Sequence, residues 1–157
     1  MASGKTRIGR RVAKLLDVPF IDTDKRIVAE HGAIPALFAE HGEAHFRTIE
    51  RRIVAQALTE RGVVSLGGGA PMDVDTHRLL LHQPVVLLTI TREAVEPRIA
   101  GEGRPMLTAG IDSWVQLTIT RMPTYLSLAQ ATWDTSSRPA DTIAQEIADW
   151  ATERRTP

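Results

Sequence analysis

Near the start of the sequence, the run Ser3-Gly4-Lys5-Thr6 has the residue types of a phosphate-binding loop. It matches the second half of the P-loop motif, in which backbone N–H groups and a helix N-terminus hold phosphates. In that arrangement Lys5 reaches the β- and γ-phosphates of a nucleotide, and Thr6 offers its hydroxyl to Mg²⁺. Ordinary helix capping is the alternative interpretation of so short a motif.

Two carboxylates, Asp22 and Asp24, follow at the end of an expected short strand. Open α/β sheets bind ligands at this end of their strands. Asp22 is suited to holding Mg²⁺ through water, and Asp24 to orienting a substrate hydroxyl or taking its proton. The alternative is that the pair only caps the next helix.

Arg47 and Glu50 are three residues apart on an expected helix that begins near Gly42-Glu43, so they share one face. An arginine held in this way suits bidentate recognition of a substrate carboxylate. A solvated surface ion pair has the same spacing and is the alternative.

Three glycines, Gly67-Gly68-Gly69, follow an expected buried strand. Residues without side chains allow the backbone to approach a ligand closely, although a flexible turn has the same composition. Further along, residues 101–112 are rich in glycine and proline and are predicted to form a surface lid. Arg98, Arg104 and Arg121 lie in or beside it, where cations would meet the charge that develops during phosphoryl transfer.

Apolar periodicity and turn signals divide the chain into alternating strands and helices. Strands are expected at residues 18–22, 63–66, 85–89 and 131–134, and helices at 5–16, 24–30, 34–41, 43–61, 74–81, 92–99, 113–128 and 141–154. Because parallel strands need helical crossovers, this alternation predicts an α/β fold with a parallel sheet covered on both faces. We expect residues 1–157 to form a single domain.

The composition limits the classes of partner. Lysine plus arginine number 19 and aspartate plus glutamate number 19, so no net field favours nucleic acid or an anionic membrane. No cysteine is present, which excludes disulfides and suits a reducing cytoplasm. Residues 85–88, the longest strand-like apolar run, are far fewer than the ~20 of a membrane helix. We expect a monomeric cytoplasmic enzyme that grips small anions locally.

In order and spacing, these motifs resemble the shikimate kinase family. The resemblance covers nearly the whole chain and rests on Gly4-Lys5-Thr6, Asp22-Thr23-Asp24, Gly42-Glu43 with Phe46-Arg47 and Glu50, Gly67-Gly68-Gly69, Arg104-Pro105, and Arg121 with Tyr125. It implies a three-layer αβα P-loop kinase fold, like that of nucleoside monophosphate kinases, with a parallel sheet in the order 2-3-1-4-5. It also implies transfer of the γ-phosphoryl group of ATP to the 3-hydroxyl of shikimate, a step toward chorismate and the aromatic amino acids.

The resemblance implies a nucleotide side that binds ATP and Mg²⁺. Its residues are Ser3, Gly4, Lys5 and Thr6 of the loop, Asp22 at the metal, Arg98 near the nucleotide, Arg104 in the lid, and Arg138 in the segment where the family forms its adenine loop. The implied acceptor side binds shikimate through Asp24, Arg47, Gly68, Gly69 and Arg121. Lys5, Asp24 and Arg104 are the implied catalytic residues, with Asp24 as the base.

One departure from the family concerns the start of the phosphate loop. The first glycine of the motif would lie two positions before Met1, and the strand that feeds the loop, central in the family's sheet, is missing from this sequence. Its two neighbours would then lie about 10 Å apart, and each unpaired buried backbone group costs on the order of 1–3 kcal/mol. We expect that this chain alone does not hold the family's sheet and that Met1 is an internal methionine of a longer protein.

Two other functions remain open on the sequence. One is a different small-molecule P-loop kinase, such as a gluconate kinase, against which the Asp-Thr-Asp, Phe-Arg and triple-glycine motifs argue. The other is a catalytically silent binding or remnant protein, which the incomplete phosphate loop would explain.

Overall fold

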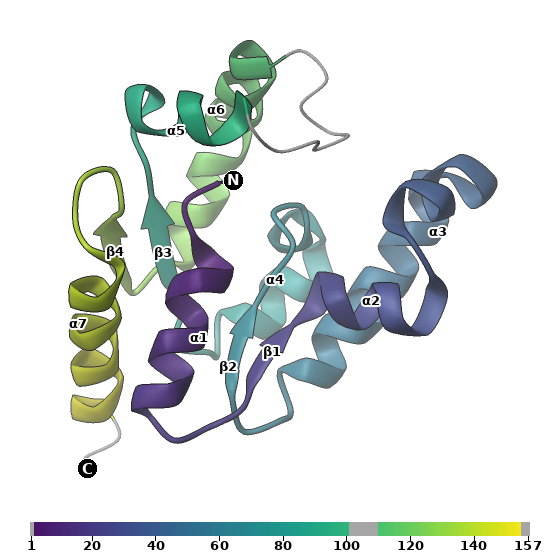
Figure 1. Ribbon diagram of the computed structural model, residues 1–157. Coiled ribbons are helices and arrows are strands. Elements are labelled where there is room, and N and C mark those ends of the chain that lie inside the picture. The colour runs from purple at the N-terminus through teal and green to yellow at the C-terminus, as the bar shows by residue number, and fades with distance from the viewer. Residues whose placement is uncertain (1, 101–109, 155–157) are drawn as a thin grey trace.

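The computed structural model describes residues 2–100 and 110–154, in which short strands alternate with helices (Figure 1). The strands are β1 (Phe20–Asp22), β2 (Val63–Ser65), β3 (Val86–Thr89) and β4 (Ala131–Asp134). The helices are α1 (Lys5–Leu15), α2 (Thr23–His31), α3 (Ile34–Ala57), α4 (Val74–Leu80), α5 (Arg92–Ala100), α6 (Gly110–Leu128) and α7 (Ala140–Glu153), with a 3₁₀ turn at Ala70–Met72. The predicted α/β class is confirmed. None of the described helices is both long and apolar enough to cross a membrane.

Helix α3 joins two segments that the sequence predicts as separate helices. Gly42 lies between them with φ 78° and ψ 172°, a conformation that strongly favours glycine. The helix ends at Ala57, earlier than predicted, and a turn leads from there into β2. The break at Gly42 comes shortly before Arg47 and Glu50, so these two residues share the second helical segment and one face of it.

The strands form two parallel pairs, not one continuous sheet. β1 pairs with β2 along its whole length, and β3 pairs with β4 in the same way. β2 and β3 are the two strands expected to flank the missing strand and to lie apart. Among the described residues they do not pair with each other, as expected. A mostly apolar cavity of about 740 Å³ lies between them, lined by both strands and by side chains of α1 and α7. Helices must therefore hold the two strand pairs together.

A core cluster beneath the phosphate-binding run does this. Helices α1 and α7 lie side by side (Figure 1), and their buried side chains contact residues of β2, β3 and β4. The buried members are Ile8, Val12, Ile143, Ala144 and Ile147, and the strand residues packed on them are Val63, Val86, Leu88 and Trp133. Full burial of each valine- or isoleucine-sized side chain contributes about 1.5–3 kcal/mol. The cluster thus fixes the start of α1 relative to both strand pairs.

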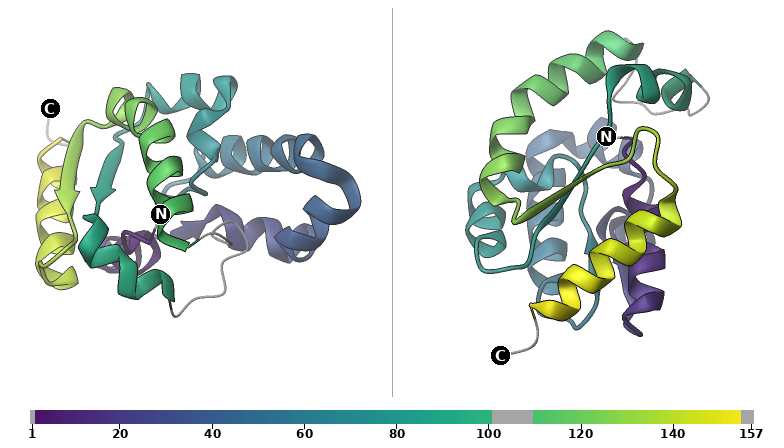
Figure 2. Two further views of the ribbon diagram at one scale, coloured as in Figure 1. Left: turned by 90° about the horizontal axis from the view of Figure 1, so that it is seen from above. Right: turned by 90° about the vertical axis from the view of Figure 1, so that its left-hand side faces the viewer.

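A second cluster joins α2 to α3. It consists of Ile27, Leu37, Phe46, Ile49 and Ile53, of which Ile27 and Ile53 are fully buried. Because Asp24 lies on α2 and Arg47 on α3, this packing sets the position of one relative to the other. The carboxyl ends of the strands point toward the edge where α1 begins, and α5 and α6 lie at the same edge (Figures 1 and 2). The predicted site residues therefore come from elements that meet at one edge.

Candidate active site

The phosphate-binding run begins α1 at the edge where the strands end. Gly4 directly precedes the helix with φ 82° and ψ 20°, a left-handed conformation that favours glycine. Among the described residues no side chain caps this helix start, so its first N–H groups point outward beyond Gly4. Ser3 is buried, and Ser3 and Lys5 both line the cavity between β2 and β3. This is the geometry of an anion site at a helix N-terminus.

Thr6 and Asp22 bring two oxygen ligands together across the start of the site. Thr6 Oγ1 donates to Asp22 Oδ2 at 3.3 Å, which joins α1 to the end of β1. The other oxygen, Asp22 Oδ1, accepts from the Lys25 backbone N–H at 3.2 Å and caps α2. The capping interpretation of Asp22 and the metal interpretation are therefore compatible. A hydroxyl and a carboxylate beside a phosphate site fit Mg²⁺, which prefers oxygen ligands and retains water.

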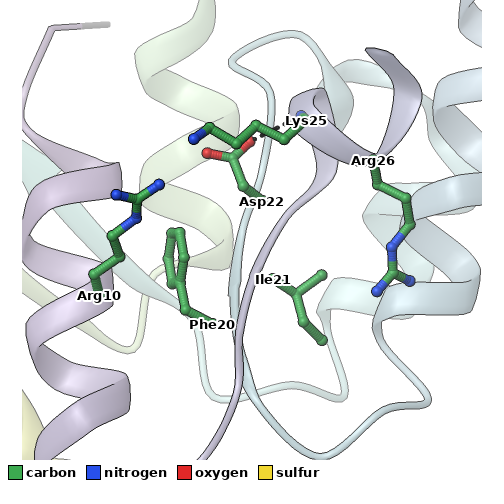
Figure 3. A pocket seen from close by; sticks show the side chains of 6 residues that line it. All are labelled: Arg10, Phe20, Ile21, Asp22, Lys25 and Arg26. Atoms are coloured by element: carbon green, nitrogen blue, oxygen red, sulfur yellow. Dashed lines mark hydrogen bonds between the residues drawn. The ribbon is translucent and has the colours of Figure 1, made fainter. Parts of the chain in front are cut away.

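An open pocket of about 490 Å³ borders Asp22 on the outer side of β1 and is lined by Arg10, Phe20, Ile21, Asp22, Lys25 and Arg26 (Figure 3). Arg10 and Lys25 point toward the Asp22 carboxylate, and the Arg10 guanidinium lies 5.7 Å from the centroid of the Phe20 ring. Arg26 turns away to pair with Glu60. Cations beside an edge strand discourage its pairing with another chain, and Arg10, Lys25 and Arg26 lie beside β1 in this way.

Asp24 lies in the first turn of α2. Burial raises the pKa of its carboxyl and the neighbouring Asp22 raises it further, while Lys5 and Arg47 act in the opposite direction. The phosphate-loop lysine and the arginine of α3 are therefore both close enough to Asp24 to affect its ionisation. A carboxylate whose pKa is raised toward neutrality is a better proton acceptor at working pH than an ordinary aspartate.

Gly67 allows two carboxylates to approach the loop that follows β2. A Cβ on Gly67 would lie 2.7 Å from Asp24 Oδ1 and 2.9 Å from Glu50 Oε1, closer than real side chains come. Thr23 anchors this loop, because its Oγ1 donates to Ser65 O at 3.2 Å and accepts from the Gly67 N–H at 3.3 Å. The start of α2, which carries Asp24, is thereby tied to the glycine loop.

Arg47 is held between two glutamates and against Gly69. Its Nη1 donates to Glu50 Oε2 at 2.6 Å, while Nε and Nη2 donate to Glu43 Oε1 at 3.2 and 3.1 Å. A Cβ on Gly69 would lie 2.8 Å from Nη2 and 2.9 Å from the central carbon of the guanidinium. The Glu50 side chain is only 4% exposed, so the Arg47–Glu50 pair is not the solvated surface pair considered above.

Arg121 of α6 brings a second guanidinium to the same place. It is 9% exposed. Burial raises the pKa of Glu50, while Arg47 and Arg121 both favour its ionised form. The half-buried Arg47 and the buried Arg121 therefore both lie beside one buried carboxylate, which places two guanidinium groups where an anionic ligand could bind. One turn further along α6, Tyr125 Oη donates to Gly68 O at 2.5 Å.

The remaining predicted residues lie toward the other end of the site. Arg98 Nη2 donates to Thr135 O at 3.0 Å and Nη1 to Ala2 O at 3.4 Å, so it connects the phosphate loop to the segment after β4. Arg138, in that segment, pairs with Glu146 of α7. Arg104 and the predicted lid from 101 to 109 lie outside the described residues, and residues 110–112 form the first turn of α6.

Two contributors to this geometry, Thr23 and Tyr125, receive no individual role from the sequence, and Gly67 is expected only to share close backbone approach with its two neighbours. Thr23 stands between two assigned residues of the Asp-Thr-Asp motif, and that position is an available signal. Tyr125 lies four residues after Arg121, hence on the same face of a helix, which was a second signal.

Phosphoryl transfer requires a phosphate cradle, a group that receives or orients the acceptor hydroxyl, and an anchor for the acceptor within one cleft. The start of α1, Asp24 and the arginines of α3 and α6 meet these requirements in an α/β fold. The fold and site thus define a small-molecule kinase of the P-loop class. The family model described as shikimate kinase matches residues 1–152, and the chain belongs to the shikimate kinase family.

Individual relatives agree with this assignment. A shikimate kinase from Salinispora tropica is 41% identical over 150 residues, which cover 93% of this chain and 90% of that protein. One from Streptomyces coelicolor is 38% identical over 153 residues, covering 95% and 90%.

Solved structures extend the agreement to the fold. The shikimate kinase from Acinetobacter baumannii in complex with shikimate matches with a TM-score of 0.87 at 30% identity, over 100% of this chain and 91% of that one. The enzyme from Bacteroides thetaiotaomicron matches with a TM-score of 0.87 at 29% identity, over 97% and 94%. The predicted αβα P-loop kinase fold is confirmed.

Proposed function

We propose that this chain transfers the γ-phosphoryl group of ATP to the 3-hydroxyl of shikimate, giving shikimate 3-phosphate and ADP. The observation that carries the proposal is the meeting of the phosphate loop, Asp24, the half-buried Arg47 and the buried Arg121 in one charged environment. Shikimate is a small carboxylic acid with ring hydroxyls. Two neighbouring guanidinium groups suit its carboxylate, and an adjacent partly buried aspartate suits a hydroxyl.

On the acceptor side, Arg47 and Arg121 bind the shikimate carboxylate next to Gly68 and Gly69. The three bonds from Arg47 to its glutamates use three of the five guanidinium N–H groups, and the other two suit a carboxylate. The 3-hydroxyl oxygen then bonds to the γ-phosphorus, and the bond from that phosphorus to the bridging oxygen of ADP breaks. Asp24 receives the hydroxyl proton.

On the nucleotide side, the phosphates lie at the N-terminus of α1, with Lys5 on the β- and γ-phosphate oxygens. Ser3 and Gly4 shape the turn before the helix. Thr6 and Asp22 would hold Mg²⁺, which neutralises phosphate charge when it is bound. Arg98 keeps the phosphate loop beside the segment after β4, where we place the adenine end with Arg138 at its margin. We propose Arg104 as a catalytic arginine of the lid because the Arg104-Pro105 motif resembles that of the family.

The proposal includes a monomer acting in the cytoplasm. All the described site residues come from one chain, so catalysis needs no second copy. A chain without cysteine suits a reducing compartment.

Shikimate-dependent release of ADP is the direct test of this function. A coupled assay with ATP and Mg²⁺ should show ADP release that depends on shikimate and saturates with it, whereas gluconate should give only the rate found without acceptor. ADP release that is equal with and without shikimate would contradict the proposal. Turnover with gluconate would instead favour a different kinase of the same architecture.

The pH profile tests the place of Asp24 in the reaction. Because Asp24 must be ionised to accept a proton, kcat/KM falls as the pH drops through its raised pKa. Asp22→Asn removes one cause of that elevation and keeps an oxygen that caps α2, so the acid limb should move to lower pH. It also removes a proposed Mg²⁺ ligand, so activity should fall at every pH, and the position of the acid limb is the quantity to compare. Because Asp24 stays buried in this variant, the midpoint of the acid limb should still lie above 3.8, the ordinary pKa of an aspartate.

The control for this experiment is Asp17→Asn at the end of α1. Asp17 is exposed and has φ 50°, a conformation that asparagine tolerates. This variant should leave the acid limb in place. An acid limb that stays fixed or moves upward in Asp22→Asn would remove Asp24 from the role of base.

A further inference from the structure

Tyr125 makes the closest side-chain contact with the backbone of the triple-glycine loop among the bonds described above. Its Oη donates to Gly68 O at 2.5 Å, from a helix that is far from Gly68 in sequence. The Tyr125 hydroxyl is half-buried, and burial raises its pKa, while the neighbouring Arg121 acts in the opposite direction. The hydroxyl therefore bonds to the loop carbonyl and lies beside the arginine of α6.

We propose that Tyr125 is a positioning residue that fixes the Gly68–Gly69 peptide and the Arg121 guanidinium together as one binding surface for the acceptor carboxylate. This inference rests on the proposed function and deepens it. Arg121 and Tyr125 are four residues apart, so they project from the same face of α6 toward the same loop.

The physical need for such a contact comes from the glycines. Consecutive glycines have more backbone freedom than any other residues, so an unsupported loop would lose part of its order when a ligand is absent. The peptide between Gly68 and Gly69 is trans, and its C=O and N–H point in opposite directions. Holding the Gly68 oxygen therefore also fixes the direction of the Gly69 N–H, which becomes a preorganised donor.

Arg121 gains in the same way. A long guanidinium side chain loses rotamer entropy when it is immobilised on a ligand, and prior fixation reduces that loss. Arg121 is buried beside Glu50 and Tyr125, so its position is already restricted before the acceptor arrives. The contact thus strengthens binding of the carboxylate and leaves the reacting hydroxyl, on another part of the acceptor, unaffected.

Tyr125→Phe isolates this effect because it removes the hydroxyl and keeps the packed ring. We expect the KM for shikimate to rise about 3- to 10-fold, the loss associated with one buried hydrogen bond. The kcat and the KM for ATP should stay within about twofold, as uniform binding of the acceptor requires. Ser127→Ala is the matched control, because that hydroxyl also lies on α6 but, within the part of the chain that the structure describes, bonds to Thr124 O of its own helix.

A carboxylate-free acceptor separates positioning from general structural damage. With the amide of shikimate, Tyr125→Phe should change kcat/KM far less than with shikimate itself, so the preference for acid over amide should fall. Equal losses for the acid and the amide, or an unchanged KM for shikimate, would overturn the inference. If the unaltered chain shows no shikimate-dependent turnover, the proposed function fails; calorimetric binding of the acid and the amide to both proteins then decides the positioning role.

Discussion

Replacing Asp24 with asparagine is expected to make the protein far less active and slightly more stable. The asparagine cannot accept a proton, so kcat should fall by about 10²- to 10⁴-fold. The gain in stability follows from the raised pKa of Asp24, which means that folding disfavours its ionised form through burial and through Asp22. A residue that lowers stability and is indispensable for turnover is typical of a catalytic position.

The sign of the stability effect depends on pH. Below the ordinary carboxyl value of 3.8, Asp24 is protonated in both the folded and the unfolded chain, and its ionisation contributes nothing. As the pH rises through the raised folded-state pKa, the folded protein must carry a disfavoured charge and loses stability relative to the variant. At neutral pH we expect a Tm gain of a few degrees, since 1 kcal/mol corresponds to about 2–4 °C in a protein of this size.

Thermal unfolding across pH and steady-state kinetics check both parts of this prediction. Asp17→Asn is again the control, since it removes an exposed carboxylate and should change neither quantity. An Asp24→Asn variant that keeps normal turnover would refute the assignment of the base. A variant that is less stable at neutral pH would show that the Asp24 charge is favoured by its surroundings.

Adding one methyl group at Gly69 is expected to damage acceptor binding without unfolding the protein. Gly69 has φ −87° and ψ −23°, which alanine adopts freely, so the backbone is not strained by Gly69→Ala. The new Cβ would overlap the guanidinium of Arg47, the far end of a flexible side chain, which must move. A guanidinium displaced in this way loses its charge-assisted hydrogen bonds to the ligand carboxylate, about 2 kcal/mol, so the KM for shikimate should rise about 30-fold.

A double-mutant cycle tells whether the loss arises through Arg47. If it does, Gly69→Ala combined with Arg47→Ala should bind shikimate no worse than Arg47→Ala alone. The KM for ATP serves as the control and should change little, and a Tm lowered by no more than a few degrees shows that the variant still folds. Additive losses in the double variant would mean that Gly69 acts independently of the arginine.

Local rules explain why much of this site could be predicted from the sequence. Asp22 and Asp24 fall at a strand end because an apolar run stops there and a helical period begins, and both signals are short-range. The Gly-Lys-Thr run likewise marks the start of α1. The two strand pairs follow from alternation with helices and from the strand order that the family resemblance implies.

The parts that could not be predicted depend on contacts between distant segments. The spacing of Arg47 and Glu50 is the same in a surface pair and a buried one, and Glu50 is buried only because the Gly67 loop and Arg121 close over it. The pairing of Arg138 with Glu146 requires that α7 fold back beside β4. The bond from Tyr125 to Gly68 joins elements whose relative position is set by packing and has no local signature.

The most direct test of the shared cleft is a crystal structure with shikimate, Mg²⁺ and a non-hydrolysable ATP analogue bound together. The account predicts the 3-hydroxyl oxygen about 2.6–3.2 Å from the Asp24 carboxylate and in line with the γ-phosphate at Lys5. It also predicts the shikimate carboxylate on Arg47 and Arg121. Nucleotide and shikimate bound in separate regions, or a 3-hydroxyl directed away from Asp24, would contradict it.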